Sequence, residues 1–361
     1  MLHDWKQNRH AVCIGVLLIG VALLLLPFVI EATTGGRTWV RVLDLALLYV
    51  ALSLGLNIVV GFAGLLDLGY IAFYAVGAYV YALLASPHFG LHLPFWLLLP
   101  MGALIAAFFG VILGAPTLRL RGDYLAIVTL GFGEIVRIFL NNLDHPINIT
   151  NGPQGVNKVD AVNVAGISFG RSAELFGVDV PGVHLHYYLF LAFVLLVIFV
   201  CVRLEDSRVG RAWVAIREDE VAAQAMGIHT RNIKLLAFAM GASFGGVAGG
   251  MFASLQGFVS PESFGLLDSI SVLCMVVLGG MGHVAGVVLG AIILATLPEL
   301  LRFTVIPIQE SLLGRVMVSP ESLRMLIFGL ALILVMRLRP AGLWPSTTRK
   351  REFAPIEKAR E

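Results

Sequence analysis

Long apolar stretches separated by short polar intervals dominate the chain. A helix needs about 20 apolar residues to cross a bilayer, within a range of roughly 17–25. Windows that meet or approach this length lie near residues 11–30, 42–60, 69–85, 94–115, 123–142, 185–203, 233–256, 267–280, 284–300 and 322–337. The pattern predicts an all-α polytopic membrane protein with about ten transmembrane helices. The count becomes nine if the two short windows 267–280 and 284–300 form one span, or if one span is re-entrant.

The polar intervals divide the chain into blocks and connections. We expect 1–41 to hold an N-terminal tail, the first transmembrane helix and an outer connection; 42–142 a first membrane block; 143–184 a periplasmic loop; 185–203 a connecting transmembrane helix; 204–232 a cytoplasmic loop; 233–337 a second membrane block; and 338–361 a basic cytoplasmic tail. The two blocks would enter the membrane from opposite sides. We therefore expect an inverted repeat of about four spans each.

The composition supports a membrane protein. Hydrophobic residues, counted without glycine, make up 58% of the chain, and charged residues make up 13%. Soluble domains contain about 45–50% apolar residues with glycine included, and about 25% charged residues. A soluble core could not absorb this much apolar surface. The first apolar run, 11–30, is longer than the hydrophobic part of a signal peptide and no A-x-A site follows it, so we expect it to be retained.

The basic residues are distributed unevenly, which sets the orientation because cytoplasmic loops carry an excess of Lys and Arg. Lys6 and Arg9 place the N-terminus inside. Alternation then places most other basic residues of the connections inside as well: Arg119, Arg121, Arg208, Arg211, Arg217, Arg231, Arg339, Arg349, Lys350, Arg351, Lys358 and Arg360. The arginines that depart from the rule are Arg37, Arg41, Arg302 and Arg315. The asymmetry predicts that both termini are cytoplasmic.

Motifs for enzymatic chemistry are absent from the sequence. It contains no H-E-x-x-H, no G-x-S-x-G and no G-x-x-x-x-G-K-[ST] phosphate loop. Cys13, Cys201 and Cys274 lie singly in apolar runs, as small hydrophobic residues do. We therefore expect a protein that is not an enzyme and that holds no metal, cofactor or nucleic acid. If a nucleotide drives transport, another chain hydrolyses it.

Two sets of glycines recur at the spacing of helix packing. Gly241, Gly245 and Gly249 form one small-xxx-small row, and the other is formed by Gly282, Gly286 and Gly290. Glycine lets membrane helices approach closely. Such rows fit the crossing points of a transporter core, but they fit simple packing in any helical membrane protein at least as well.

A third glycine pattern interrupts the apolar run between the second and third windows. Gly64 and Asp67 lie in this interval and are followed by Tyr70 and Tyr74 on one helical face. An interrupted helix at membrane depth is tolerated where it lines a cavity or is buried in protein. These four residues are candidates for a translocation pathway. For each tyrosine taken singly, ordinary packing or an interfacial aromatic belt is the simpler interpretation.

Few ionisable residues lie within the predicted spans: Asp44, Asp67, Glu134, Arg137 and Glu299. Each is costly at a helix centre and should face a partner or water. Glu134 and Arg137 are three residues apart and can form an ion pair on one helical face. Asp44 is the residue that an ion-coupled transporter would use.

The interval 203–234 is the densest polar stretch before the C-terminal tail. Asp219 can cap a short helix that ends at Gly227, and Thr230 can cap the next span. We expect two short helices on the cytoplasmic face, with Ala222, Ala223 and Ala225 offered outward or to a neighbour. A docking element and a solvated connector fit this composition about equally.

The sequence resembles the permease subunits of branched-chain amino acid ABC importers of the LivM type, over nearly the whole chain after the first span. The segments that carry the resemblance are GLLDLGYIAFYAVGAY, LRLRGDYLAIVTLGFGEIVRI, TNGPQG, the interval 208–234, GFVSPESF and VVLGGMGHVAGVVLGA. The resemblance implies an ABC importer permease fold in the bacterial inner membrane. It also implies a second homologous permease, two ABC ATPase subunits and a periplasmic binding protein as partners.

In this family a Glu-Ala-Ala-x-x-x-Gly signature docks on the ATPase. Ala222, Ala223 and Gly227 match the pattern, whereas Val221 stands at the glutamate position and Glu220 precedes it by one residue. The resemblance thus implies an ATPase-coupling site formed by Arg217, Glu220, Ala222, Ala223 and Gly227. The substrates that it implies are leucine, isoleucine and valine. A related permease for urea or short amides, and an ion-coupled secondary transporter, are the alternatives.

Overall fold

The computed structural model describes residues 20–32, 36–117, 120, 122–164, 167–170, 172–175, 178–313, 319–338 and 342–344. Predictions that concern 1–19, Arg119, Arg121, Arg315, and most of the tail 338–361 lie outside these residues. The described part is mostly helical, as predicted.

Helices form the body of the protein. After an apolar helix at Gly20–Glu31 come α2 (Gly36–Asn57), the π-helix η1 (Ile58–Phe62), α3 (Ile71–Leu84), α4 (Phe95–Thr117), α5 (Asp123–Asn142), α6 (Gly182–Glu205), α7 (Arg208–Glu218), α8 (Glu220–Ala225), α9 (Thr230–Gln256), α10 (Leu266–Gly279), α11 (Val284–Leu313) and α12 (Pro320–Leu338). Two 3-10 helices, η2 (Gly152–Gln154) and η3 (Pro261–Phe264), lie in the connections.

Short strands occur between α5 and α6 and directly after α9. They are β1 (Val156–Asn157), β2 (Asn163–Val164), β3 (Ile167–Ser168), β4 (Ala173–Leu175), β5 (Val178–Val180) and β6 (Phe258–Val259). β1 and β6 are antiparallel, with Val156 opposite Val259, and this pair ties the interval before α6 to the end of α9. The prediction of an all-α chain therefore holds for the bundle but misses these strands.

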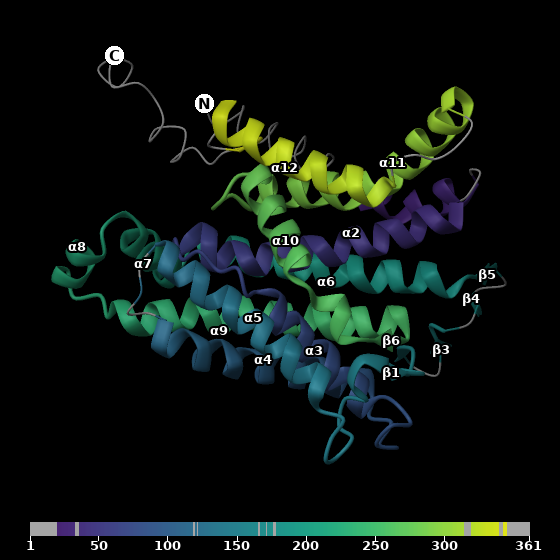
Figure 1. Ribbon diagram of the computed structural model, residues 1–361, viewed down its shortest axis with the longest axis horizontal. Helices are drawn as coiled ribbons and strands as arrows, with labels where there is room; N and C mark the ends of the chain where they lie inside the picture. Colours follow the sequence, from purple (N-terminus) through teal and green to yellow (C-terminus); the bar gives the residue numbers. More distant parts are fainter. Residues whose placement is uncertain are drawn as a thin grey trace, which may run out of the picture.

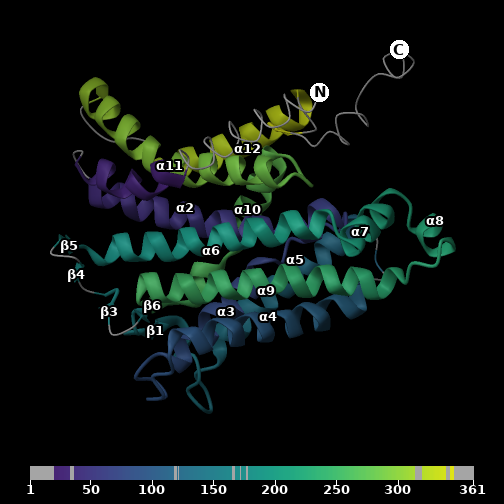
Figure 2. The same cartoon turned by 180° about the vertical axis from the view of Figure 1, so that it is seen from behind.

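Most of the long helices follow the long axis of the molecule, and α10 crosses it (Figures 1 and 2). Both views place α7 and α8 at one extremity and β3, β4 and β5 at the other. We call these extremities the loop end and the hairpin end. Successive long helices therefore run in alternating directions between the two ends.

Within the described residues, six helices are long and apolar enough to cross a membrane: Gly36–Phe62, Phe95–Thr117, Gly182–Glu205, Thr230–Gln256, Pro261–Gly279 and Val284–Pro307. Shorter apolar helices occupy Gly20–Glu31, Ile71–Leu84 and Ser322–Val335. A polytopic helical membrane protein is thus confirmed by length and composition, whereas the count of ten spans stays a prediction. α10 and α11 are separate helices joined at 280–283, so the two short windows do not merge.

Glycine contacts hold α9 close to its neighbours. A Cβ atom on Gly77 would overlap the backbone of Gly246, and one on Gly249 would overlap the carbonyl oxygen of Tyr74. A Cβ atom on Gly241 would overlap the Val59 side chain and lie 3.0 Å from the Gly55 carbonyl oxygen of α2. With no Cβ atoms at these positions, the backbones of α2, α3 and α9 approach within van der Waals contact.

The second glycine row joins α10 to α11. Gly286 and Gly290 of α11 both lie against the backbone at Gly279 of α10. Gly282 has a φ of 82° in the turn between the two helices, a conformation that glycine adopts without strain.

We expect Gly77→Ala to destabilise the protein by about 1–3 kcal/mol or more, because the added methyl group meets backbone atoms that cannot move aside. Thermal unfolding of the purified protein in detergent measures this. Gly131→Ala is the matched control, since no atom lies within 4 Å of the position that its Cβ would occupy. Equal melting temperatures for the two variants would contradict the close α3–α9 contact.

Candidate coupling site

Two short helices at the loop end are defined by side-chain caps. Ser207 precedes α7, and its Oγ accepts a hydrogen bond from the Gly210 amide at 3.0 Å. Asp219 precedes α8, and its Oδ1 accepts from the amides of Val221 at 2.8 Å and Ala222 at 3.0 Å. Gly227 follows α8 with a φ of 86°. The predicted cap and stop of α8 are confirmed, because the side chain satisfies amides that a helix start leaves unpaired.

The predicted cap of α9 is wrong. Thr230 is the first residue of that helix, and His229 occupies the N-cap position without a side-chain hydrogen bond. Threonine is a common N-cap residue, but an N-cap lies just outside the helix. Here the helix already begins at Thr230, so the cap position falls one residue earlier, at His229.

Trp213 anchors α7 to the bundle. Its side chain is fully buried, and its Nε1 donates a hydrogen bond to the carbonyl oxygen of Ile233 in α9 at 2.7 Å. Ile216 is buried on the same side of α7. A Cβ atom on Gly210 would overlap the Leu204 carbonyl oxygen at the end of α6. α7 is therefore fixed against both α6 and α9.

Arg217, a residue in the last turn of α7, reaches the interrupted segment after α2. Its Nη1 donates to the carbonyl oxygen of Gly61 at 2.9 Å, within the π-helix η1. A Cβ atom on Gly64 would lie 2.5 Å from the Arg217 Cγ, so glycine makes room for this side chain. Gly64 also has a φ of 69°. Short π-helices are frequent at functional sites, and here one is held by a side chain from the loop end.

The turn between α10 and α11 meets the same place. The Gly282 amide donates to Asn57 Oδ1 at 2.8 Å, directly before η1. A Cβ atom on Gly61 would overlap this Asn57 side chain. These contacts join α7, η1 and the α10–α11 turn. We call the residues that make them the junction: Asn57, Gly61, Arg217 and Gly282.

Glu220, the first residue of α8, pairs with Lys234 of α9. Its Oε1 lies 2.6 Å from the Lys234 Nζ, and the lysine side chain is buried. A cavity of about 200 Å³ adjoins this pair and is also lined by Gly64, Asp123 and Arg217. The ion pair therefore fixes the start of α8 to the bundle beside the junction.

The side chains of α8 divide between an inner and an outer face. Ala223 is buried, with 4% of its surface exposed, so of the two expected placements, outward or against a neighbour, its position fits the second. It lies one turn after the cap, on the face that α8 turns toward the bundle. Ala222 and Ala225 are exposed, together with Val221 and with Met226, which is 84% exposed. This exposed apolar surface is small and faces away from the bundle.

The other pathway candidates, Asp67, Tyr70 and Tyr74, are buried within the bundle. Asp67 is buried; its Oδ1 accepts from the Gly69 amide at 2.9 Å, and its Oδ2 has no hydrogen-bond partner within the described part of the chain. Tyr70 donates to the Gly241 carbonyl oxygen at 3.0 Å. Tyr74 packs against Phe252 and Phe264. Both tyrosines therefore contact neighbouring elements of the bundle, and their place in a translocation pathway stays a prediction.

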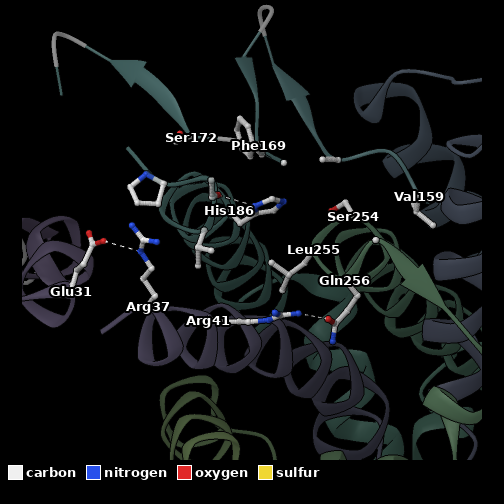
Figure 3. Close-up of a pocket in the computed structure, with 16 residues that line it drawn as sticks. Glu31, Arg37, Arg41, Val159, Phe169, Ser172, His186, Ser254, Leu255 and Gln256 are labelled. Atoms are coloured by element: carbon white, nitrogen blue, oxygen red, sulfur yellow. Dashed lines mark hydrogen bonds and ion pairs between the residues drawn. The ribbon is translucent and has the colours of Figure 1, made fainter. Parts of the chain in front are cut away.

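A larger cavity of about 780 Å³ lies at the hairpin end, between α2, α6, the end of α9 and the strands (Figure 3). Arg41 donates to Gln256 Oε1 at 2.6 Å, and Arg37 lies 3.4 Å from Glu31. Arg37 and Arg41 are two of the arginines that depart from the positive-inside rule. Among the described residues, no cluster of His, Cys, Asp and Glu could hold a metal ion.

Sequence reasoning missed three residues of this region. Asn57 and Lys234 lie inside apolar windows as single polar residues, which is a weak signal for a specific role. Trp213 is a single aromatic residue in a charged stretch. Its burial follows from the packing of α7, which the local pattern does not encode.

The architecture defines an integral membrane protein whose helical bundle carries a capped two-helix element at one end. A family model described as "Branched-chain amino acid transport system / permease component" matches residues 38–336. The chain belongs to this family. Its membership confirms the resemblance seen in the sequence, and it confirms a transport subunit rather than an enzyme.

Individual relatives agree with the family. The high-affinity branched-chain amino acid transport system permease protein LivM of Escherichia coli K12 is 44% identical over 344 residues, which cover 91% of this chain and 74% of the relative. LivH of the same organism is 27% identical over 254 residues, covering 68% of this chain and 79% of the relative. BraD of Pseudomonas aeruginosa is 26% identical over 304 residues, covering 82% and 91%. No solved structure matches the chain significantly.

Removing the cap of α8 tests its local geometry. We expect Asp219→Ala to lower the stability of α8 by about 0.5–2 kcal/mol, because two amides lose their acceptor. Hydrogen exchange of the peptide that contains 220–226 should become roughly 2- to 30-fold faster. Gln224→Ala, an exposed change on the same helix, should leave the exchange unchanged. Equal exchange in the two variants would contradict the cap.

Proposed function

We propose that this chain is a permease subunit of an ATP-driven importer for leucine, isoleucine and valine in the bacterial inner membrane. It forms the translocation pathway with a second homologous permease and works with two ABC ATPase subunits and a periplasmic amino-acid-binding protein. LivM and LivH are separate permease proteins named for the same kind of transport system in one organism, which supports a pair of permeases.

The loop 204–232 is the ATPase-coupling element in this proposal. The observation that carries it is the contact between Arg217 of α7 and the Gly61 carbonyl oxygen of η1. α8 exposes Val221, Ala222 and Met226 for docking, while Trp213 and the Glu220–Lys234 pair fix the element to the bundle. Movement of a docked ATPase is then passed through a rigid α7 to an interrupted membrane helix, as alternating access requires.

This assignment also orients the chain. The loop end faces the cytoplasm, the hairpin end and the interval 143–184 face the periplasm, and both termini are cytoplasmic. Ten spans then cross the membrane, with α3, α5 and α12 counted among them. The Arg208, Arg211, Arg217 and Arg231 side chains fall on the cytoplasmic side, in agreement with the positive-inside rule.

An inverted repeat is part of the proposal, and the helix lengths support it. α2 with η1 spans 27 residues and is followed by the 14-residue α3. In the same way, α9 spans 27 residues and is followed by the 14-residue α10. The contacts repeat as well: α9 packs on α3 and α4, and α2 packs on α10 and α11. Blocks 42–142 and 233–337 therefore correspond through α2–α5 and α9–α12.

An ion-coupled secondary transporter is the second candidate. The observation that favours it is Asp44, a fully buried residue of α2 whose two carboxylate oxygens have no hydrogen-bond partner among the described residues. Buried carboxylates in membrane helices often mark ion pathways.

Substituting the exposed tip of α8 tests the docking surface. We expect Met226→Asp to reduce co-purification with the ATPase subunits by at least about tenfold, because burying a carboxylate in an apolar contact costs more than the ~1.4 kcal/mol that a factor of ten represents. Ile147→Asp, an exposed apolar position of the interval 143–184, should leave co-purification unchanged. Normal assembly and normal leucine uptake by Met226→Asp would remove the docking assignment.

Energy source and substrate separate the candidates. We expect uptake of labelled leucine to stop when ATP is depleted and to persist when a protonophore collapses the proton gradient, because hydrolysis drives the step. Unlabelled valine should compete, whereas urea and short amides should not. The reverse dependence on ATP and the proton gradient would favour the Asp44 mechanism, and competition by urea would favour the related amide permease.

A further inference from the structure

The cavity of about 780 Å³ at the hairpin end has the size of a small-molecule site (Figure 3). Ligand pockets in proteins measure about 300–1,000 Å³ and combine mostly apolar walls with a few polar groups. Val159, Phe169 and Leu255 belong to the apolar wall of this cavity, and its polar lining includes Arg41 and His186. The polar groups therefore decide what the cavity can bind.

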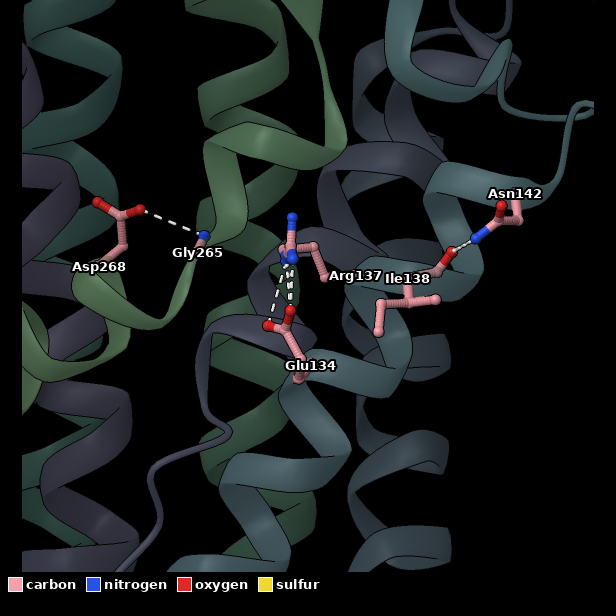
Figure 4. A network of polar contacts seen from close by, with 6 residues as sticks. All are labelled: Glu134, Arg137, Ile138, Asn142, Gly265 and Asp268. Carbon is pink, nitrogen blue, oxygen red and sulfur yellow. Dashed lines mark hydrogen bonds and ion pairs between the residues drawn. The ribbon is translucent and has the colours of Figure 1, made fainter.

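Arg41 of α2 lines the cavity without a carboxylate in contact among the described residues. Its Nη2 donates to the neutral side chain of Gln256, at 2.6 Å from Oε1. Arg137 of α5, by contrast, donates to the Glu134 carboxylate at 3.0 Å on its own helix (Figure 4). Guanidinium groups bind carboxylates in a two-pronged geometry. Arg41 therefore has this capacity available for a ligand.

The start of α6 adds donors for an anion. Gly182 and Val183, the first two residues of α6, line the cavity, and Pro181 before them provides no side-chain cap. The first amides of a helix lack intrahelical partners and carry the positive end of the helix dipole. Such termini bind anions. Two helices, α2 and α6, thus direct anion-binding groups at one cavity.

His186 supplies an acceptor instead. Its side chain is 5% exposed, its Nδ1 lies 2.9 Å from the Gly182 carbonyl oxygen, and Phe169 packs edge-on against its ring. Because a carbonyl oxygen only accepts, Nδ1 carries the proton, and Nε2 of the neutral ring is an acceptor. Nε2 has no hydrogen-bond partner within the described part of the chain. A ligand that donates a hydrogen bond satisfies this buried atom.

Glu31 adds a negative charge to the same cavity. Its Oε1 lies 3.4 Å from Arg37 Nε, and the Arg37 side chain is 78% exposed, so solvent weakens this pair. Arg37 and Arg41 are four residues apart and share one face of α2. Figure 3 shows Glu31 and Arg37 at one side of the hollow, with Arg41 and His186 farther along. The cavity therefore offers donors for an anion and acceptors for a cation within one volume.

We propose that this cavity binds a free amino acid with an aliphatic side chain. Arg41 and the amides at the start of α6 bind the α-carboxylate, while Glu31 and His186 Nε2 accept from the α-ammonium. The aliphatic side chain packs on the wall that includes Phe169 and Leu255. A simple anion leaves both acceptors unused, and a phosphate group is repelled by Glu31.

The inference rests on the proposed amino acid transport and deepens it. It assigns to this chain a substrate site of its own, on the periplasmic side in the proposed orientation. Binding at this site does not require the periplasmic binding protein.

Equilibrium dialysis with labelled leucine tests the site on the purified importer complex, in phosphatidylcholine nanodiscs without binding protein or ATP. We expect saturable binding that Arg41→Gln weakens at least about tenfold, because charge-assisted hydrogen bonds to the carboxylate are lost. Arg302→Gln is the matched control. It removes the same charge from an exposed residue of α11 that does not line the cavity, and it should leave binding unchanged.

Leucine analogues separate the two halves of the site. Isocaproate keeps the carboxylate and lacks the ammonium group, whereas isopentylamine keeps the ammonium group and lacks the carboxylate. Each should displace labelled leucine at least about tenfold more weakly than unlabelled leucine does. His186→Phe keeps an aromatic ring and removes the acceptor, so it should weaken leucine binding and leave isocaproate binding unchanged.

Equal leucine binding by the wild type and Arg41→Gln would overturn the proposal, as would displacement by isocaproate as strong as that by leucine. The analogue comparison uses the wild type, so it stands even where a variant fails to fold. Absence of leucine binding, with phosphatidylglycerol retained by the wild type and lost from Arg41→Gln, would show a lipid site and overturn it too. ATP-independent leucine uptake by the complete wild-type importer would instead refute the proposed function.

Discussion

Close backbone contact around α9 is the constraint on which the rest of the structure depends. Lipid tails are as apolar as leucine, so burial of apolar side chains alone does little to hold membrane helices together, and packing at short range must do it. Gly246 and Gly249 bring α3 against α9, and Gly241 brings α2 to the same helix. With these three helices held together, the interrupted segment between α2 and α3 has a fixed course through the bundle.

That course brings the segment to the loop end, beside the turn between α10 and α11. Backbone groups of both the segment and the turn need hydrogen-bond partners there. Gly61 offers a carbonyl oxygen to Arg217, and the Gly282 amide is bound by Asn57. Backbone polar groups that lack a regular helical partner are costly away from water. The junction satisfies them with side chains from α7 and α2, so the same contacts that stabilise an irregular backbone also link the loop end to the membrane helices.

Two ion pairs involve charged residues of the long helices. Lys234 is paired with Glu220 at the loop end, and Arg137 is paired with Glu134 within α5. The first pair is mostly buried and fixes two elements to each other. The second is half-exposed and lies on one helix, so it adds little to the fold.

The sequence by itself determined the membrane class, the ten apolar windows, and the cap and stop of α8 at Asp219 and Gly227, because these depend on composition, on period and on neighbours within one helical turn. Contiguous motifs were also enough to identify the family. Only the tertiary structure decided that Ala223 faces inward, that Tyr70 bonds to the Gly241 backbone, and that Arg217 meets Gly61. The last of these contacts joins residues more than 150 positions apart. Such outcomes depend on how helices cross, which no local pattern encodes.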